Sequence, residues 1–508
     1  ALTRQWSDKA SAIGFDPKAV IAKANARAAN DIGYAGGFAT AARDLAARGK
    51  ELITALAERF GLREGDPLIP ADLARRQPEE IAAIHAVASA IRHLAEREAA
   101  FARTDIYRTA LGFGLPAGMA AIERRVAQLE RQGQLQRGKG AERGLVTTAG
   151  AIATEQRIVA AVEAGRGMAS AIVQPGDAGS RLQGLSQLKY GMTLNQGQEA
   201  AGRLLLGSSN RIVAVQGIAG AGKSTMLRPV ADILREEGKA VLGLAVQNTL
   251  VQMLERETGI PSMTVARFLK RHAALLEGGD KAALAKARAE MRGTVVLLDE
   301  ASMVGNSDKD KLVRLANLLE LDRFAAIGDK KQLGAVDAGK PFDVMQQAGA
   351  ETATMNLNIR ARDKALRAAQ YAAQGGKIDE ALRHLGKDVV EVREGAAIEA
   401  AAAWLSLSPA DRERTAIYAS GRSLRGQVNE AVQTGLKANG EIGEPSLKLQ
   451  VLARINTTQE ELRHAGTYQV GMVVEVERDK RAQGISRGMY RVIGADPRRE
   501  RVELESER

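Results

Sequence analysis

Cysteine is absent from the 508 residues, which excludes disulfides and cysteine-based zinc sites. Aromatic residues make up only 3% of the chain, so we expect cores of alanine, leucine, valine and isoleucine packed on helices. The sequence has no run of roughly 18 apolar residues and no signal peptide at its start, so we expect no membrane insertion. These absences together predict a cytoplasmic protein.

Acidic residues are in the minority. The chain has 61 of them against 72 lysines and arginines, which gives a net charge of +11 and a sequence pI near 9.7. A basic balance favours a polyanionic partner, most often nucleic acid. A soluble basic protein without such a partner is the alternative, and charge alone does not separate the two.

The first third of the chain predicts mostly helices. Residues 1–100 show helical apolar spacing, so we expect a helical accessory region there. Residues 101–173 predict two helices and then a hairpin with a basic tip, which is the order of a winged-helix module. Such a module either contacts DNA or packs with a solvated basic tip, and both interpretations stay open.

The rest of the chain predicts an α/β protein with a β-rich end. Apolar strands alternate with helices over residues 185–350, which indicates a parallel sheet covered by helices on both faces. A weaker α/β pattern spans residues 351–446, where "RTAIYAS" (414–420) is the clearest strand. Residues 447–508 alternate apolar with polar side chains and predict a small antiparallel barrel.

The stretch "GIAGAGKST", residues 217–225, fits a loop that binds phosphates between a strand and a helix. Its glycines let backbone N–H groups converge on phosphate oxygens at the start of the helix. We expect Lys223 to reach the β- and γ-phosphates of ATP and Ser224 to hold Mg²⁺. The predicted nucleotide-binding residues of this loop are Gly217, Gly220, Gly222, Lys223, Ser224 and Thr225.

Two carboxylates follow the apolar strand "VVLL", residues 295–298. Asp299 would bind Mg²⁺ through water, and Glu300 would polarise the water that attacks ATP. Further along, Gln332 in "IGDKKQL" is either a sensor of the γ-phosphate or part of an ordinary turn. Gln198 in "LNQGQ" either reads the adenine edge or only follows Asn195 at a helix start.

Taken together, these stretches resemble the motifs of superfamily one DNA helicases. The order along the chain is "LNQGQ", "GIAGAGKS", "LAVQNT", "SMTVARFL", "VLLDEASM", "IGDKKQL" and "LNIRARD". Within that group the chain is similar to the RecD-like branch, and more closely to conjugative relaxase-helicases of the TraI/TrwC class. This closer resemblance rests on two segments, "LVTTAGAIATEQRIVAAVEAGRG" before the motor and "YQVGMVVEVERD" after it.

The resemblance implies RecA-like motor domains that hydrolyse ATP with Mg²⁺ and move along single-stranded DNA, 5′ to 3′. It assigns Gln198 to adenine, Gln332 to the γ-phosphate and Arg360 to an arginine that reaches across from a second motor domain. It also places Asn248, Thr264 and Phe268 along the DNA path, although Phe268 is equally well explained as a core residue.

The sequence departs from the family pattern in three ways. Ala361 follows Arg360 where the family usually has glutamine, the last helicase motifs are not found before Arg508, and no nicking domain is recognisable. We therefore expect an interior piece of a longer relaxase-helicase that by itself hydrolyses ATP slowly or not at all. The alternative function is a non-hydrolysing piece that binds DNA and is recognised by the type IV secretion apparatus, with a coupling protein as partner. The parent would act in a bacterial donor cell and be translocated to the recipient.

Overall fold

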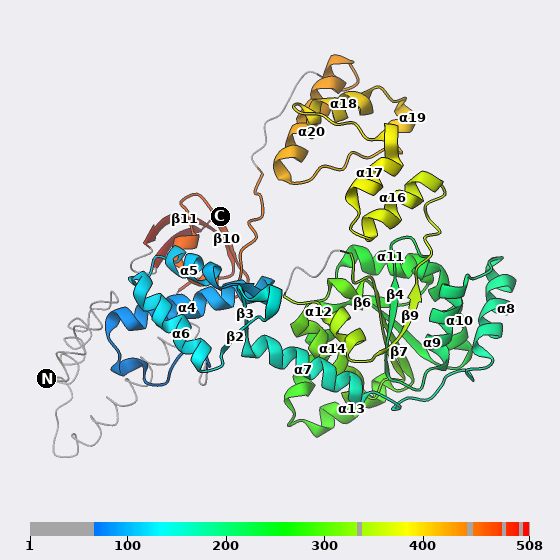
Figure 1. Ribbon diagram of the computed structural model, residues 1–508, viewed down its shortest axis with the longest axis horizontal. Helices are drawn as coiled ribbons and strands as arrows, with labels where there is room; N and C mark the ends of the chain where they lie inside the picture. The colour runs from blue at the N-terminus through cyan, green and yellow to red at the C-terminus, as the bar shows by residue number, and fades with distance from the viewer. Residues whose placement is uncertain (1–65, 333–337, 444–450, 480–483, 497–500, 507–508) are drawn as a thin grey trace. The chain divides into compact units, whose positions relative to one another are not determined.

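The computed structural model describes residues 66–332, 338–443, 451–479, 484–496 and 501–506 (Figure 1). The chain divides into two compact units, one formed by residues up to Arg360 together with those from Asn456, and the other by Ala361–Ile455. Residues 1–65 of the predicted accessory region lie outside the described residues. No described helix combines the length and the apolar composition needed to cross a membrane.

The first part of the larger unit is a small module of helices with a three-stranded antiparallel sheet. Its elements are η1 (Leu73–Arg75), α4 (Pro78–Arg97), β1 (Ala100–Ala102), α5 (Arg103–Gly112), α6 (Met119–Arg131), β2 (Leu135–Arg137), η2 (Gly140–Glu142) and β3 (Leu145–Thr148). The sheet order is β1-β3-β2. Ile91 of α4 shares one core with Phe101, Ile122 and Val146, so the predicted boundary at residue 100 falls inside a core.

A parallel six-stranded sheet forms the centre of the larger unit and confirms the predicted α/β class. Its strands are β4 (Ile212–Gly217), β5 (Ala240–Ala245), β6 (Ser262–Thr264), β7 (Thr294–Leu298), β8 (Arg323–Gly328) and β9 (Glu351–Met355). The order is β6-β5-β7-β8-β4-β9. Because β9 pairs with β4, residues 351–355 belong to this first sheet and not to a second domain as predicted.

Helices cover both faces of the sheet (Figure 1). They are α7 (Ala149–Ala164), α8 (Ala178–Tyr190), α9 (Gln196–Gly207), α10 (Lys223–Glu236), α11 (Asn248–Thr258), α12 (Val265–His272), η3 (Ala273–Glu277), α13 (Lys281–Met291), η4 (Ala301–Met303), α14 (Asn306–Leu318) and α15 (Pro341–Gln347). Successive residues of a strand face opposite sides. Val295 and Leu297 therefore join the core with α9 and α10, and Val296 and Leu298 join the core with α7 and α14.

The smaller unit is helical in its described residues. It contains α16 (Lys364–Gln374), α17 (Ile378–Leu385), η5 (Gly386–Asp388), α18 (Ala396–Leu405), α19 (Pro409–Arg412) and α20 (Arg422–Ala438). The predicted strand at 414–420 is wrong, because these residues belong to none of the sheets and Tyr418 is 95% exposed. A strand needs a hydrogen-bonded neighbour whatever its propensity, and the described part of this unit offers none.

The chain then returns to the larger unit and becomes β-rich. It forms η6 (Glu461–Arg463), η7 (Ala465–Thr467), β10 (Val473–Val476), β11 (Gly488–Asp496) and β12 (Arg501–Ser506). The three strands are antiparallel as predicted, but the described residues form an open sheet of order β10-β11-β12 and not a closed barrel. His464 Nε2 lies 3.1 Å from Ser89 Oγ, and this contact joins the segment to α4.

Candidate active site

The phosphate-binding loop joins the end of β4 to the start of α10. Gly220 and Gly222 have φ values of 76° and 75°, in the left-handed region that favours glycine. A Cβ on Gly220 would lie 2.6 Å from Asn358 Oδ1, and one on Gly222 would lie 2.6 Å from Gln198 Nε2. Both conformation and close packing therefore require glycine at these two positions.

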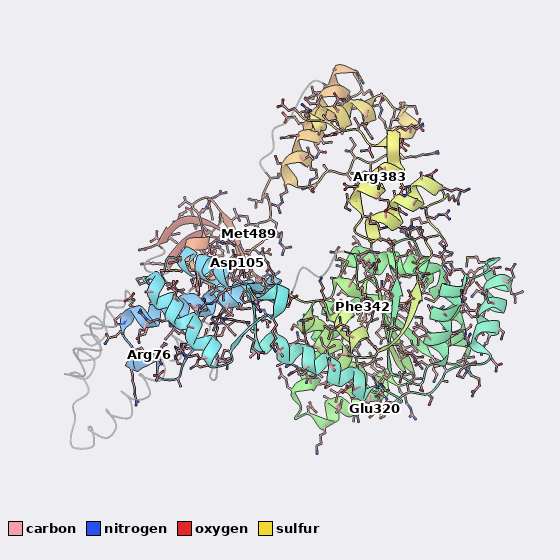
Figure 2. The ribbon with its side chains drawn as sticks, in the orientation of Figure 1. Arg76, Asp105, Glu320, Phe342, Arg383 and Met489 are labelled. Carbon is pink, nitrogen blue, oxygen red and sulfur yellow. The ribbon has the colours of Figure 1, made fainter. Side chains whose placement is uncertain are left out.

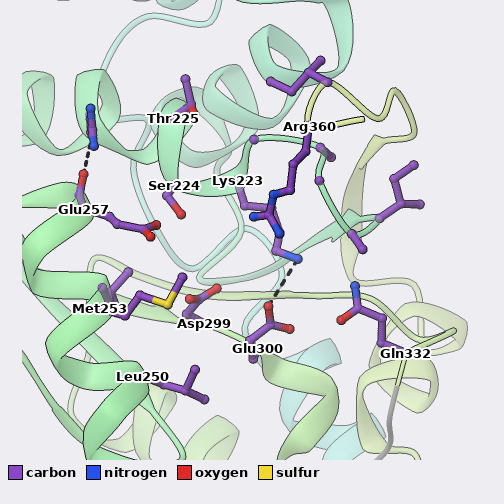
Figure 3. A pocket seen from close by; sticks show the side chains of 18 residues that line it. Lys223, Ser224, Thr225, Leu250, Met253, Glu257, Asp299, Glu300, Gln332 and Arg360 are labelled. Atoms are coloured by element: carbon purple, nitrogen blue, oxygen red, sulfur yellow. Dashed lines mark hydrogen bonds and ion pairs between the residues drawn. The ribbon is translucent and has the colours of Figure 1, made fainter. Parts of the chain in front are cut away.

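The lysine of the loop faces the two carboxylates at the end of β7 (Figure 3). Lys223 Nζ donates to the Gly217 carbonyl at 3.2 Å and lies 3.5 Å from Glu300 Oε1. Burial and the neighbouring Glu300 raise the pKa of Asp299 to about 6, while Lys223 opposes the shift. The end of β7 therefore places two carboxylates close to the lysine of the loop.

A divalent cation fits this charge pattern. Mg²⁺ prefers oxygen ligands and is usually held by one or two carboxylates together with substrate phosphates. The Ser224 hydroxyl and the Asp299 carboxylate supply such oxygens beside the loop, and both residues line one cavity. No group of three or more histidine, cysteine, aspartate or glutamate side chains suited to a metal occurs among the described residues.

Glu300 has an unusual backbone. Its φ and ψ are 46° and 48°, and apart from glycines only Glu320 shares a positive φ in the described part of the chain. This conformation costs an L-residue roughly 1–2 kcal/mol. Met303 N donates to the Glu300 carbonyl at 2.9 Å, and Lys309 Nζ donates to the next carbonyl, that of Ala301, at 3.0 Å. These bonds hold the turn that directs the Glu300 carboxylate toward Lys223.

Lys309 was not identified from the sequence, where it lies in an ordinary amphipathic helix. Its side chain on α14 is fully buried, and its Nζ lies 5.9 Å from the centre of the Phe342 ring. Phe342 is labelled in Figure 2. Burial lowers the pKa of Lys309 from 10.5 to about 7. A buried lysine of this kind destabilises the fold relative to an apolar side chain of similar size.

Lys309→Met is therefore expected to stabilise the protein by about 1 to 4 kcal/mol near pH 7. The folded state holds the lysine proton less tightly than the unfolded chain, so the wild type gains stability as pH rises from 7 toward 10.5. The advantage of the methionine variant should thus be largest at or below pH 7 and shrink at pH 9. Urea unfolding at several pH values measures it, and a variant that is less stable at pH 7 would contradict the expectation.

The predicted sensor Gln332 is held by a residue that the sequence pattern did not single out. Gln332 Nε2 donates to Asp329 Oδ2 at 3.2 Å. The buried Asp329 also accepts from Gln216 Nε2 at 2.7 Å and from Lys331 N at 3.1 Å. Gln216 lies on β4 directly before the loop, so a chain of side-chain hydrogen bonds links the phosphate loop to Gln332. The only signal in the sequence was the Gly-Asp pair.

Arg360 contacts the loop from the same unit. Its backbone N–H donates to the Gly220 carbonyl at 3.2 Å, as does that of Ile359 at 2.9 Å. Asn358 Oδ1 accepts from Arg360 N at 3.0 Å. The predicted approach from a second motor domain is therefore wrong for this structure, because the segment is hydrogen-bonded to the loop itself.

One cavity of about 500 Å³ brings most of the predicted residues together (Figure 3). It is lined by residues 218–225, Arg228, Leu250, Met253, Leu254, Glu257, Asp299, Glu300, Gln332, Ile359 and Arg360. Gln198 is not in the lining. Its side chain caps α9 with Asn195 and donates to the Ala221 and Gly222 carbonyls at 3.3 Å, so adenine recognition by Gln198 stays a prediction.

The three predicted DNA contacts differ in exposure. Asn248 is exposed at the first residue of α11, and Thr264 is half-buried and caps α12 by accepting from Arg267 N at 3.2 Å. Phe268 is 2% exposed in the core beneath the sheet, with its ring 4.8 Å from that of His272. Base stacking by Phe268 is therefore corrected to a packing role.

These placements predict opposite effects for two alanine substitutions. Phe268→Ala should cost about 3–5 kcal/mol of stability and leave the affinity for single-stranded DNA unchanged while the protein is folded. Asn248→Ala should leave stability unchanged and weaken DNA binding. Thermal unfolding and fluorescence titration with a labelled oligonucleotide measure both. Loss of DNA affinity in a folded Phe268 variant would restore the stacking role.

Comparison with known proteins agrees with the α/β fold and with the phosphate loop. Residues 193–395 match a family model described as an AAA domain, and residues 451–508 match the DNA relaxase TraI 2B/2B-like domain. The multifunctional conjugation protein TraI of Escherichia coli (strain K12) is 32% identical over 198 residues, which are 38% of this chain and 11% of that protein. The conjugal transfer protein TraA of Rhizobium radiobacter is 31% identical over 193 residues, 37% of this chain and 16% of that protein.

The chain thus spans only a small part of these relatives. Among solved structures, the Pif1 helicase from Candida albicans superposes with a TM-score of 0.30 and 20% sequence identity. The match covers 43% of this chain and 55% of that one. This likeness is too low to support a conclusion. Over its central region, this chain is a homologue of the conjugative relaxase-helicases TraI and TraA, with an AAA domain followed by a TraI 2B/2B-like domain.

Proposed function

We propose that this chain is the ATP-dependent, single-stranded-DNA-translocating module of a conjugative relaxase-helicase. The observation that carries the proposal is the assembly of Lys223, Asp299, Glu300, Gln332 and Arg360 around one cavity at the phosphate loop. These side chains supply the cations, the carboxylates and the amide that phosphoryl transfer to water requires. The homology over residues 193–395 supports the same assignment.

In this proposal each residue of the site has a separate role in ATP hydrolysis. Lys223 and the loop N–H groups bind the β- and γ-phosphates. Ser224 and Asp299 would hold Mg²⁺, which would supply positive charge to these phosphates. Glu300 orients and polarises the attacking water, and Gln332 reports the presence of the γ-phosphate through its link to Asp329. Arg360 stabilises the negative charge that develops on the transferred group.

The proposed DNA path runs along the carboxyl edge of the sheet. Asn248 follows β5 and Thr264 ends β6, and both strands are parallel to β4, so these residues share an edge with the phosphate loop. Nucleotide turnover and DNA contact would therefore be coupled through one rigid sheet. Travel from 5′ to 3′, a type IV secretion coupling protein as partner and a cytoplasmic site of action in the donor cell belong to this proposal only through the resemblance of the sequence motifs.

A steady-state ATPase assay with single-stranded DNA tests the proposal on this chain and on a longer form of the protein. We expect the long form to hydrolyse ATP faster when DNA is present, and Lys223→Ala to abolish this activity. We expect this chain to be slow or inactive, because the described residues of the smaller unit, 361–443 and 451–455, contain helices and no second sheet. A long form without DNA-stimulated turnover would overturn the proposal.

The helical character of the smaller unit favours one alternative function. A piece whose second unit has no sheet in its described residues could bind DNA and a secretion partner without turnover. Retained DNA affinity together with no hydrolysis in either form would support this alternative over the motor.

A further inference from the structure

The module before the motor has the connectivity of a helix-turn-helix domain with a β-hairpin. α4 and α5 pack against the inner face of α6, which buries Ile122, Val126 and Leu129 in their common core. β2 and β3 then form an antiparallel hairpin whose tip spans residues 138–144. The outer face of α6, which exposes Ala120, Glu123 and Arg124, is left without a covering element in the described part of the protein.

The cations of α5, α6 and the hairpin that are not buried fall into two groups. Arg103 and Arg137 both bind Glu130, at 3.0 and 2.6 Å, and Arg108 binds Asp105 at 2.6 Å. In contrast, the exposed Arg124, Arg131, Lys139 and Arg143 have no ion-pair partner among the described residues.

These four cations lie on α6 and at the hairpin tip, where Glu123 and Glu142 are the exposed carboxylates. Four positive charges against two negative ones leave a net positive surface. The paired arginines are thus neutralised by Glu130 and Asp105, and the surplus positive charge lies on α6 and at the hairpin tip.

We propose that α6 and the β2–β3 hairpin form a docking surface for duplex DNA, with α6 in the major groove and the hairpin tip against the phosphate backbone. An α-helix about 10–12 Å wide fits the major groove, which is about 12 Å wide. Ala120 in the first turn of α6 is exposed and carries little bulk, so this part of the helix can approach base edges closely. Lys139 and Arg143 at the hairpin tip suit phosphate contacts, which position a protein on the duplex without reading its sequence.

This surface is separate from the proposed single-strand path. Asn248 and Thr264 lie at the sheet edge, whereas α6 and the hairpin belong to the core of the preceding module. A chain with both surfaces would hold the duplex beside the single strand that it translocates. The inference does not depend on ATP hydrolysis, so it can fail or succeed independently of the motor.

The test uses fluorescence anisotropy at several salt concentrations with a blunt duplex, a duplex bearing a single-stranded tail, and a single strand. The variant is Arg124→Ala, Arg131→Ala, Lys139→Ala and Arg143→Ala combined. The control is Arg76→Ala with Arg108→Ala, which removes two positive charges where the variant removes four, from arginines of the same module that are paired with Asp72 and Asp105. Arg76 and Asp105 are labelled in Figure 2.

We expect the combined variant to bind both duplexes at least about tenfold more weakly at low salt. The slope of log affinity against log salt should fall by about 0.9 for each phosphate that the variant no longer neutralises. Its single-strand affinity and unfolding temperature should match those of the control. Unchanged duplex affinity would overturn the proposal and leave an acidic protein as the partner of this surface. An equal loss of affinity for duplex and single strand would also overturn it, because the cations would then act only as general charge.

Discussion

Arg360→Ala is expected to lower the ATPase rate of a hydrolysing form of the protein on the order of a thousandfold, with a much smaller effect on nucleotide affinity. The guanidinium lines the cavity beside Lys223, where negative charge develops during phosphoryl transfer (Figure 3). The backbone bond from Arg360 N to the Gly220 carbonyl survives the substitution, so the loop should keep its conformation. Single-turnover hydrolysis and nucleotide titration separate the two effects.

Arg362→Ala is the matched control for this substitution. Arg362 is an exposed arginine two residues along the chain and does not line the cavity. Its substitution removes the same charge from the surface and should leave hydrolysis near the parental rate. If both substitutions slowed the enzyme equally, Arg360 would act through the general field of the protein and not as a group at the reacting phosphate.

Glu300→Gln should stop hydrolysis and preserve binding. The amide keeps the shape of the side chain and removes the charge that polarises water, a change that typically lowers the rate about a hundredfold or more. It also removes the carboxylate that lies 3.5 Å from Lys223 Nζ, so the lysine becomes fully available to phosphates. Nucleotide affinity should therefore stay the same or increase while turnover falls.

Glu320→Gln is a close control, because Glu320 is the other non-glycine residue of the described chain with a positive φ. It lies outside the cavity and pairs with Arg288 at 3.1 Å. The same chemical change there should leave turnover unaffected. A Glu300 variant that hydrolyses ATP at the rate of this control would show that another group activates the water.

The sequence by itself predicted the phosphate loop and the two carboxylates that line one cavity with it. The glycine spacing before Lys223 and the apolar run before Asp299 are local patterns, because a strand, its turn and the next helix are contiguous in the chain. The parallel sheet could also be predicted from the sequence, because its strands are apolar on both faces and alternate with helices. Local patterns of this kind can be recognised in the sequence without knowledge of the fold.

Only the tertiary structure decided which residues meet. Phe268 has the same neighbours in sequence whether it stacks on a base or fills a core, and its burial against α14 and the sheet settled the difference. Residues 414–420 have the propensity of a strand, but strand formation depends on a hydrogen-bonded neighbour that sequence position does not supply. Asp329 accepts from Gln216 of β4, and Lys309 of α14 holds the turn at Glu300, through hydrogen bonds between separate elements. Such contacts depend on the packing of helices against the sheet, so no local sequence pattern indicates them.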